Sequence, residues 1–189
     1  VLLCVLTLFL LLLPALVETT FKVELPTPLE ATVLLFVFAA EILGEIGSFY
    51  QHIPHWDTVL HTITGFWAAG VGFSLVDLLN RRSQRNHLTP LFVALVAFCF
   101  SMTVGVMWEF FEFGSDRFLH TDMQKDRIVS RVDTTELDPD KNNNVVHIRD
   151  VGHTVLYGAD GTELARIEGG YLDVGIIDTM KDLFVNMIG

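Results

Sequence analysis

The sequence predicts an all-α polytopic membrane protein with about five transmembrane helices and a small extramembrane β insert between helices four and five. Hydrophobic residues make up 51% of the 189 residues, and the mean hydropathy is +0.46. Several apolar runs approach the roughly 20 residues that a helix needs to cross a bilayer. A polar stretch separates the last two of these runs. The formal net charge of −11 argues against nucleic acid as a partner, because such a partner requires a basic surface.

The first two apolar runs are predicted as helices from Val1 to Val17 and from Leu29 to about Tyr50. Residues 18–28 form a connector, because its two prolines disfavour a continued helix. In the second run, Glu41 and Glu45 lie one turn apart on one face. The chain starts inside an apolar run without a Met and stops inside another, so we expect a longer protein with further spans upstream.

The third helix is predicted from His55 to about Asn80, and the fourth begins at Leu91. A short basic loop with Arg81, Arg82 and Arg85 lies between them. The four helices form a first region, residues 1–118. Cys4 and Cys99 both lie inside apolar runs, where we expect them to be small buried residues.

A polar extramembrane insert, residues 119–170, follows the fourth helix. Apolar and polar residues alternate at 145–148, 153–157 and 162–167, and Ala159-Asp160-Gly161 is a turn signal. These patterns predict a β-hairpin or a three-stranded meander, in which His147 and His153 are ordinary strand or surface residues. Residues 171–189 are predicted as the start of a fifth helix that continues beyond the sequence.

Acidic residues repeat at helical spacing in the fourth and fifth helices. Glu109, Glu112 and Asp116 follow the apolar part of helix four at intervals of three and four, so they share one face. In helix five, a second polar stripe repeats every four residues and consists of Asp178, Asp182 and Asn186. Lys181 is predicted to point away from this stripe.

Alternating crossings bring these stripes to one membrane face, together with Glu41 and Glu45, which makes seven carboxylates there, and with His61. A charged side chain at the bilayer centre costs about 2.5–3.5 kcal/mol, so seven carboxylates cannot all face lipid. They line a hydrated cavity, share protons, pair with His61 or bind a cation. A wetted, purely structural end of the helix bundle is the alternative that the sequence leaves open.

Asp57 precedes His61 by four residues, so it either caps the helix or orients the imidazole. His61, oriented by Asp57, is predicted as a general base or a metal ligand. One histidine among many carboxylates suits Mg²⁺, Mn²⁺ or Ca²⁺ better than a structural Zn²⁺. The predicted metal ligands are His61, Glu109, Glu112, Asp116, Asp178 and Asp182, with Glu41, Glu45 and Asn186 as a supporting polar stripe.

Three sequence blocks resemble a known pattern: residues 56–61 with Gly65-Phe66, residues 109–112, and residues 178–182 with Asn186 and Gly189. The chain is similar to the YjdF-like bacterial membrane proteins and, more distantly, to the VanZ-like group linked to teicoplanin resistance. The resemblance runs from Trp56 to Gly189, interrupted by an insert larger than we expect in VanZ-like proteins. It implies a small bacterial inner-membrane protein with a polar, membrane-embedded site, and it supplies no established reaction.

Three functions are compatible with these features. The first is a divalent-cation-dependent enzyme that acts on a lipid or polyprenyl-phosphate head group, with membrane lipids as partners. The second is a cation- or proton-coupled transporter, which the apolar residues from Leu91 to Phe98 weaken because they interrupt a polar path. The third is a structural or envelope-stress protein without catalysis. Three arginines in the 81–85 loop favour a cytoplasmic loop, which puts the polar cluster and the insert on the outer face.

Overall fold

The computed structural model describes residues 2–21, 27–82 and 88–189. They form two compact units, Val1–Ser101 with Val185–Gly189, and Met102–Phe184. The secondary structure is mostly helical, with a small β insert between the two longest helices and the last one. Two helical segments in the described part of the chain are long and apolar enough to cross a membrane, Trp56–Asp77 and Pro90–Leu119.

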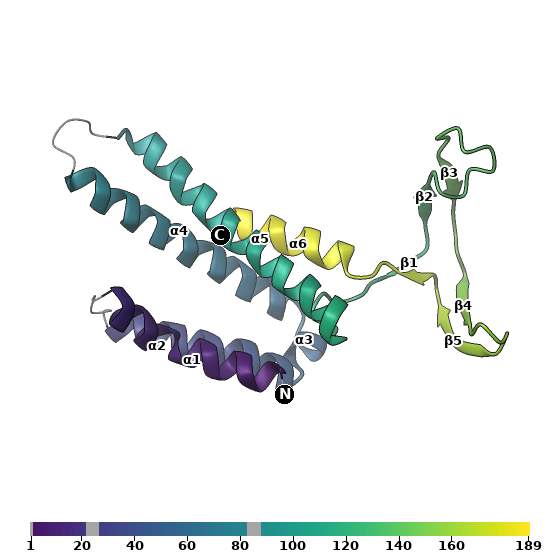
Figure 1. Ribbon diagram of the computed structural model, residues 1–189, viewed down its shortest axis with the longest axis horizontal. Coiled ribbons are helices and arrows are strands. Elements are labelled where there is room, and N and C mark those ends of the chain that lie inside the picture. The colour runs from purple at the N-terminus through teal and green to yellow at the C-terminus, as the bar shows by residue number, and fades with distance from the viewer. Residues whose placement is uncertain (1, 22–26, 83–87) are drawn as a thin grey trace. The chain divides into compact units, whose positions relative to one another are not determined.

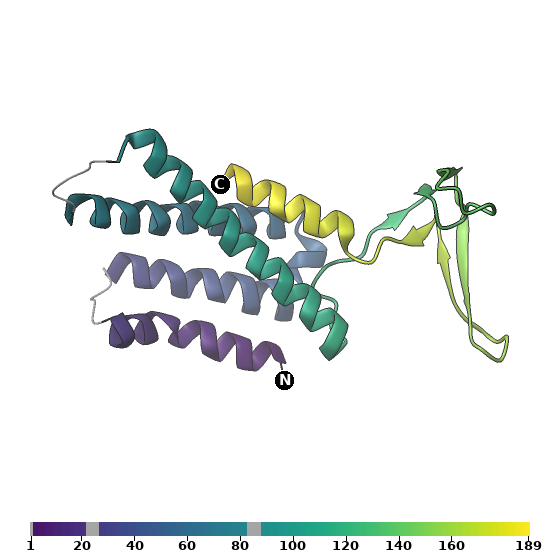
Figure 2. The same cartoon turned by 45° about the horizontal axis from the view of Figure 1, so that its top comes forward.

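The first unit begins with two helices that lie side by side and run in opposite directions, α1 (Leu2–Phe21) and α2 (Thr27–Val37) (Figure 1). Figure 2 shows α1, α2 and α4 (Trp56–Arg82) stacked in that order within the unit. The predicted connector is shorter than expected, because α1 continues through residues 18–21 and α2 already starts at Thr27. Pro28 lies in the first turn of α2, where a proline is tolerated because the N–H that it lacks would have no intrahelical partner. Pro26 lies outside the described residues.

The predicted second helix is not one continuous α-helix. After α2, residues Phe38–Ile46 form a π-helix, η1, and a short helix, α3, follows at Phe49–His52. The break falls at Gly47 and Ser48, and Ser48 has a left-handed backbone with φ of 58°. Hydropathy alone did not reveal this break, because the apolar pattern runs through it.

Helix α4 packs closely against the first part of α5 (Pro90–Leu119). A Cβ added at Gly72 would lie 2.8 Å from the Cβ of Phe100, so the two helices approach at a residue without a side chain. Large apolar side chains on the outer surfaces of these helices are exposed, including Phe66 and Leu91 at 67% and 80%. Cys4 and Cys99 are exposed as well, so the expectation that they are buried is wrong. Such a surface is typical of helices that face lipid.

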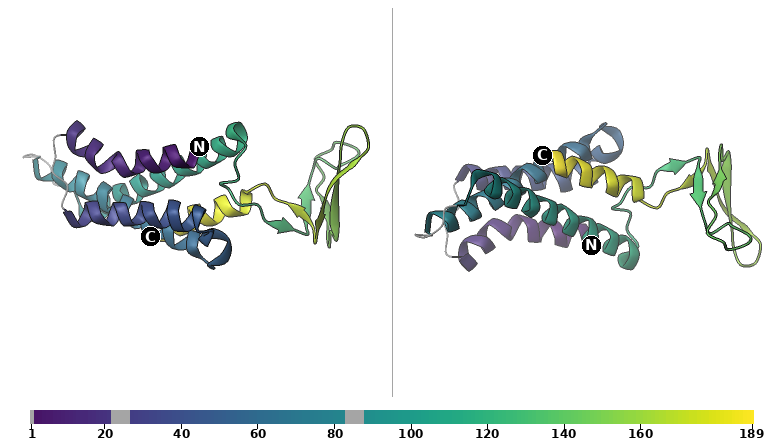
Figure 3. Two further views of the ribbon diagram at one scale, coloured as in Figure 1. Left: turned by 90° about the horizontal axis from the view of Figure 1, so that it is seen from below. Right: turned by 90° about the horizontal axis from the view of Figure 1, so that it is seen from above.

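The β insert of the second unit contains three two-stranded antiparallel ladders. The pairs are β1 (Ile128–Val129) with β6 (Tyr171–Leu172), β2 (Val132–Thr134) with β3 (Val146–Ile148), and β4 (His153–Tyr157) with β5 (Glu163–Glu168). Figure 3 shows β4 and β5 as one long ribbon. The predicted hairpin around the 159–161 turn is present as the β4–β5 pair. The alternative of a three-stranded meander is wrong, because β3 pairs with β2 instead of β4. Strands of two or three residues are too short to produce an alternating pattern, so β1, β2 and β6 were missed.

Helix α6 (Ile176–Ile188) starts later than predicted, because residues 171–172 belong to β6. Gly175 has φ of 79°, a left-handed conformation that glycine adopts without strain. A Cβ at this position would lie 2.7 Å from the Cβ of Gln124. The turn before α6 therefore depends on glycine for both its backbone conformation and its close packing.

Candidate functional site

The Asp57–His61 pair lies in the first turns of α4. His61 Nε2 is 3.4 Å from Asp57 Oδ1, and the two side chains are 13% and 28% exposed. The four-residue spacing on a helix brings them together, as the sequence predicted. A carboxylate in this position orients the imidazole ring and favours one tautomer.

One turn further along α4, Gly65 is the point where three helices of the first unit meet. Ser101 Oγ of α5 donates a hydrogen bond to the Gly65 carbonyl at 2.9 Å, and Asn186 Nδ2 of α6 donates to the Ser101 carbonyl at 3.2 Å. Both Ser101 and Asn186 are 3% exposed. A Cβ at Gly65 would lie 2.5 Å from the Asn186 carbonyl oxygen. Asn186, predicted as part of a supporting stripe, is therefore a buried contact between helices.

Glu41, also predicted as a supporting residue, is 7% exposed on η1. Thr7 Oγ1 of α1 donates a hydrogen bond to its Oε2 at 3.2 Å. Glu45, four residues later, is half-buried. A buried carboxylate on a π-helix is notable, because π-helical turns occur frequently at functional sites.

In the second unit, the acidic end of α5 is largely buried. Glu109 and Glu112 are 5% and 8% exposed. Trp108 Nε1 donates a hydrogen bond to Glu112 Oε1 at 2.8 Å, and its ring packs against Phe111 with centroids 5.4 Å apart. The aromatic residues around the glutamates therefore contribute a hydrogen-bond donor as well as apolar surface.

Asp178 and Asp182 are among the most buried polar residues described, at 4% and 2% exposed. Lys181 Nζ lies 3.1 Å from Asp182 Oδ1 and 3.5 Å from Asp178 Oδ1. The prediction that Lys181 points away from the acidic stripe is wrong. A flexible lysine stem reaches both carboxylates from the neighbouring helix position, which a count of helical spacing does not capture.

Asp116 and Asp178 hold the segment of residues 121–127, which we call the strap. Oδ1 of Asp116 accepts hydrogen bonds from Thr121 Oγ1 at 2.8 Å and from Met123 N at 2.6 Å, and Oδ2 accepts one from Gln124 N at 2.8 Å. Asp178 Oδ2 accepts the next backbone N–H, that of Lys125, at 3.0 Å. The backbone N–H groups of the strap therefore donate hydrogen bonds to carboxylates of α5 and α6.

Asp173 completes this arrangement. It accepts hydrogen bonds from Arg127 N at 2.6 Å and from Ile177 N at 2.9 Å, so it joins the strap to the first turn of α6. Partial burial raises the pKa of Asp173, but the backbone hydrogen bonds outweigh this effect and the net pKa is lowered. The sequence placed Asp173 on the fifth helix, whereas it precedes α6 and caps it. An Asp followed by a glycine-containing turn and an apolar run is the signal that could have identified this cap.

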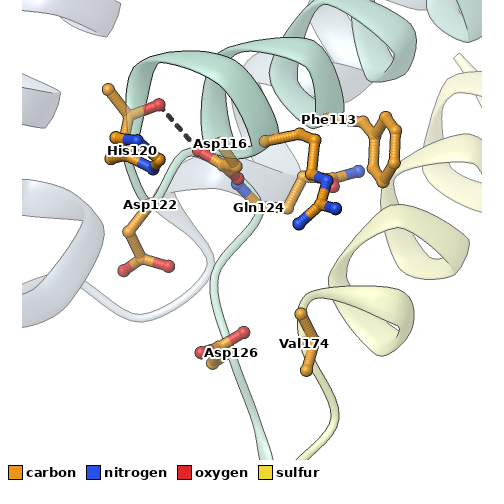
Figure 4. A pocket seen from close by; sticks show the side chains of 9 residues that line it. Phe113, Asp116, His120, Asp122, Gln124, Asp126 and Val174 are labelled. Carbon is orange, nitrogen blue, oxygen red and sulfur yellow. Dashed lines mark hydrogen bonds between the residues drawn. The ribbon is translucent and has the colours of Figure 1, made fainter.

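A cavity of about 290 Å³ lies beside the strap, and Figure 4 shows the residues around it. It is lined by Phe113, Asp116, Arg117, His120, Thr121, Asp122, Gln124, Asp126 and Val174. Burial, followed by repulsion from Asp122, Asp173 and Asp116, raises the pKa of Asp126. Apart from Asp116, sequence reasoning did not single out these residues. Asp122 and Asp126 follow the end of α5, where no periodic pattern connects them with Asp116.

The comparisons with known proteins agree with a membrane protein. Residues 1–140 match the model of a family described as "Predicted membrane protein (DUF2238)". An uncharacterised protein of Thermotoga maritima is 29% identical over 96 residues, which cover 51% of this chain and 48% of that relative. The chain thus matches about half the length of this relative. No solved structure matches the chain.

The YjdF-like resemblance is confirmed, because YjdF belongs to the same family. The more distant VanZ-like resemblance stays a prediction. The family match covers α1 to α5, the helices that include the two candidate spans and the Asp57–His61 pair. The chain therefore belongs to the DUF2238 family of predicted membrane proteins.

Proposed function

We propose that this protein is a multi-pass protein of the bacterial inner membrane that binds a divalent cation and acts on the phosphate-bearing head group of a lipid or polyprenyl carrier. In this proposal α1, α2 with η1, α4, α5 and α6 all cross or enter the bilayer. The cation site combines the Asp57–His61 pair with Asp182 and the glutamates of α5. The family description and the two candidate spans support the membrane part of the proposal.

The observation that carries the proposal is the contact between Asn186 and Gly65. Asp182 precedes Asn186 by one turn of α6, and His61 precedes Gly65 by one turn of α4. Residues four apart lie on one face of a helix. Asn186 packs on Gly65, and the proposal assigns the faces of α4 and α6 that carry His61 and Asp182 to the cation.

The donor set suits a hard cation. His61 and Asp182 each offer one ligand atom, and Asp57 orients the imidazole of His61. Mg²⁺, Mn²⁺ and Ca²⁺ favour carboxylate oxygens, and Glu109 and Glu112 would add more of them. A cation held by these groups would supply Lewis-acid chemistry at a phosphoryl oxygen. His61 would act either as a ligand of that cation or as the base that takes a proton from water. Asp116 and Asp178, whose oxygens accept hydrogen bonds from the strap, have a positioning role in this proposal.

A cation- or proton-coupled transporter is the second candidate. The buried hydrogen bond from Thr7 to Glu41 favours it, because a carboxylate within an apolar helix bundle is typical of ion pathways. The two candidates share the cation site and differ in what happens at it. Lipid turnover therefore distinguishes an enzyme from a transporter, which instead produces cation flux in liposomes.

The experiment is metal analysis of the full chain purified in detergent, with Mg²⁺, Mn²⁺ or Ca²⁺ supplied in turn. We expect one cation to bind stoichiometrically. His61→Ala and Asp182→Asn should abolish this binding, and Asp57→Asn should weaken it by about 10–100-fold, because a positioning carboxylate tunes its histidine. Asp140→Asn, a change at an exposed insert aspartate, is the matched control and should bind normally.

The outcome that contradicts the proposal is a wild-type protein that binds none of the three cations stoichiometrically. Equal loss of binding in Asp140→Asn and Asp182→Asn would also reject the site. If binding is confirmed, lipid or polyprenyl-phosphate turnover that is lost in His61→Ala supports the enzyme. Flux without turnover supports the transporter.

A further inference from the structure

Four charged side chains gather at the β2–β3 ladder, outside the sites described above. Asp133 of β2 and His147 of β3 are register partners. Arg131 precedes Asp133 by two residues and Arg149 follows His147 by two. The two arginines lie just outside the strands, and ion pairs with Asp133 join the four side chains into one cluster, which we call the arginine face.

Asp133 is the centre of the arginine face. Its Oδ1 is 2.6 Å from both His147 Nδ1 and Arg149 Nη1, and its Oδ2 is 2.9 Å from Arg131 Nε. The hydrogen bond with His147, then that with Arg149, lowers the pKa of Asp133 to about 2. One carboxylate therefore holds two guanidinium groups and an imidazole together.

The charge of this cluster is unusual for the chain. Acidic residues outnumber basic residues by 23 to 12, yet two arginines share a single carboxylate here. Arg166 on β5 shows the opposite balance, because it lies within 3.8 Å of Glu163 and 3.7 Å of Glu168. At the β2–β3 ladder the two guanidinium charges meet one carboxylate charge, that of Asp133. Arg131 and Arg149 therefore keep an excess positive charge that Asp133 only partly compensates.

We propose that the arginine face binds a phosphate group. A guanidinium has five N–H donors in a planar fork that matches phosphate oxygens. Asp133 engages Nε of Arg131 and Nη1 of Arg149. Arg149 also makes longer contacts of 3.4 Å with the Ile148 carbonyl and His147 Nδ1, and each of the five-donor guanidinium groups retains N–H groups for a second anion. The three basic side chains are 67%, 46% and 60% exposed for Arg131, Arg149 and His147, which leaves them accessible to a ligand.

Asp133 has a specific part in this proposal. It fixes the two guanidinium groups, but it also competes with phosphate for their donors. The substitution Asp133→Asn removes the charge and keeps the shape of the side chain, so it should strengthen phosphate binding. A purely structural ion-pair cluster predicts the reverse, since it would only lose order when Asp133 is changed.

The test measures binding of inorganic phosphate to the full chain in neutral detergent by calorimetry. A second arm mixes the protein with phosphatidylcholine vesicles that contain or lack phosphatidic acid. It measures how much protein sediments with the vesicles, relative to a sample without vesicles. Saturable binding of inorganic phosphate identifies a free phosphate site. Binding that requires phosphatidic acid vesicles identifies a lipid head group as the source of the phosphate.

We expect Arg149→Gln and Arg131→Gln each to weaken binding by at least about tenfold, because hydrogen bonds to charged groups are the strong ones. Arg149→Lys, which keeps the charge but loses the fork, should fall between wild type and Arg149→Gln. Asp133→Asn should bind more tightly than wild type. Arg166→Gln is the matched control on the neighbouring hairpin and should bind within about twofold of wild type.

Three results would overturn the proposal. One is the lack of saturable binding in both arms. Another is an Arg166→Gln variant that loses as much binding as Arg149→Gln, since this would mean that general charge is responsible. The third is weaker binding by Asp133→Asn while its circular dichroism spectrum matches that of the wild type. The comparison of Asp133→Asn with wild type stays informative even if an arginine variant disturbs the hairpin.

Discussion

Carboxylates that look equivalent in the sequence have different partners in the structure. Asp116, Asp173 and Asp178 accept hydrogen bonds from backbone N–H groups of the strap or of α6. Asp57 instead lies beside His61. Backbone N–H donors lower the pKa of Asp173 and favour its charged form, whereas a carboxylate crowded by other acids is disfavoured in its charged form. Asp126 is the clearest example of the second kind.

Asp126→Asn should stabilise the protein at neutral pH. Burial and neighbouring aspartates raise the pKa of Asp126 above its ordinary value of 3.8, so its ionised form is disfavoured in the folded state. The protein therefore loses stability as the pH rises from about 3.8 through the raised pKa. We expect a melting temperature about 1–2 °C higher than that of the wild type at pH 7 and no difference at pH 3.

The measurement is a thermal melt of the detergent-solubilised protein over this pH range. Asp140→Asn removes the same charge from another exposed position of the insert and should not reproduce the pH-dependent gain. A melting temperature of Asp126→Asn that is lower than that of wild type at pH 7 would contradict the repulsion.

At the scale of elements, glycine positions on α4 determine how closely its neighbours approach. Gly65 meets the last turn of α6, and Gly72 meets α5 at Phe100. Small residues at such positions let helix backbones come close, which is how helices associate in membranes. Gly70 differs, because a Cβ added there would meet nothing within 4 Å.

Gly65→Ala should therefore destabilise the protein by about 1–3 kcal/mol, since the new methyl group would overlap the Asn186 carbonyl oxygen. Gly70→Ala on the same helix is the matched control. It should be neutral or stabilising by about 0.5–1 kcal/mol, because alanine favours a helix interior more than glycine. Chemical unfolding in mixed micelles measures both. Equal effects of the two substitutions would show that close packing at Gly65 is not responsible.

At the scale of the whole molecule, the family and the two candidate spans support a membrane protein. If α4 and α5 both cross the bilayer, the chain between them and the β insert are on opposite sides. The arginines at 81 and 82 and Arg85, which lies outside the described residues, favour a cytoplasmic loop between α4 and α5. We therefore propose that the insert faces outward.

Single cysteines introduced in a background without Cys4 and Cys99 test this orientation. Asp160→Cys, at a turn of the insert, should react with a membrane-impermeant maleimide in intact spheroplasts. Leu88→Cys, just before α5, should react only after the membrane is permeabilised. The reverse labelling pattern would place the insert in the cytoplasm. Labelling of both cysteines in intact spheroplasts would argue against two crossings.

The sequence by itself determined the features that depend on residues close together in the chain. Long apolar runs determined the helices α4 and α5, and a four-residue spacing determined the Asp57–His61 pair. The existence of a β insert followed from alternation in residues 145–167. These features are local, because a helix face or a strand face is defined by its own periodicity.

Only the tertiary structure decided which groups meet across long stretches of chain. Asp178 binds Lys125 N, Asp173 binds Arg127 N, and Asn186 binds the Ser101 carbonyl, at sequence separations of 53, 46 and 85 residues. The three separate ladders of the insert and the reach of Lys181 to Asp182 also depend on folding. Hydropathy and spacing identify which side chains are polar. They do not show which carboxylate accepts which backbone N–H group, because donor and acceptor meet only in the folded chain.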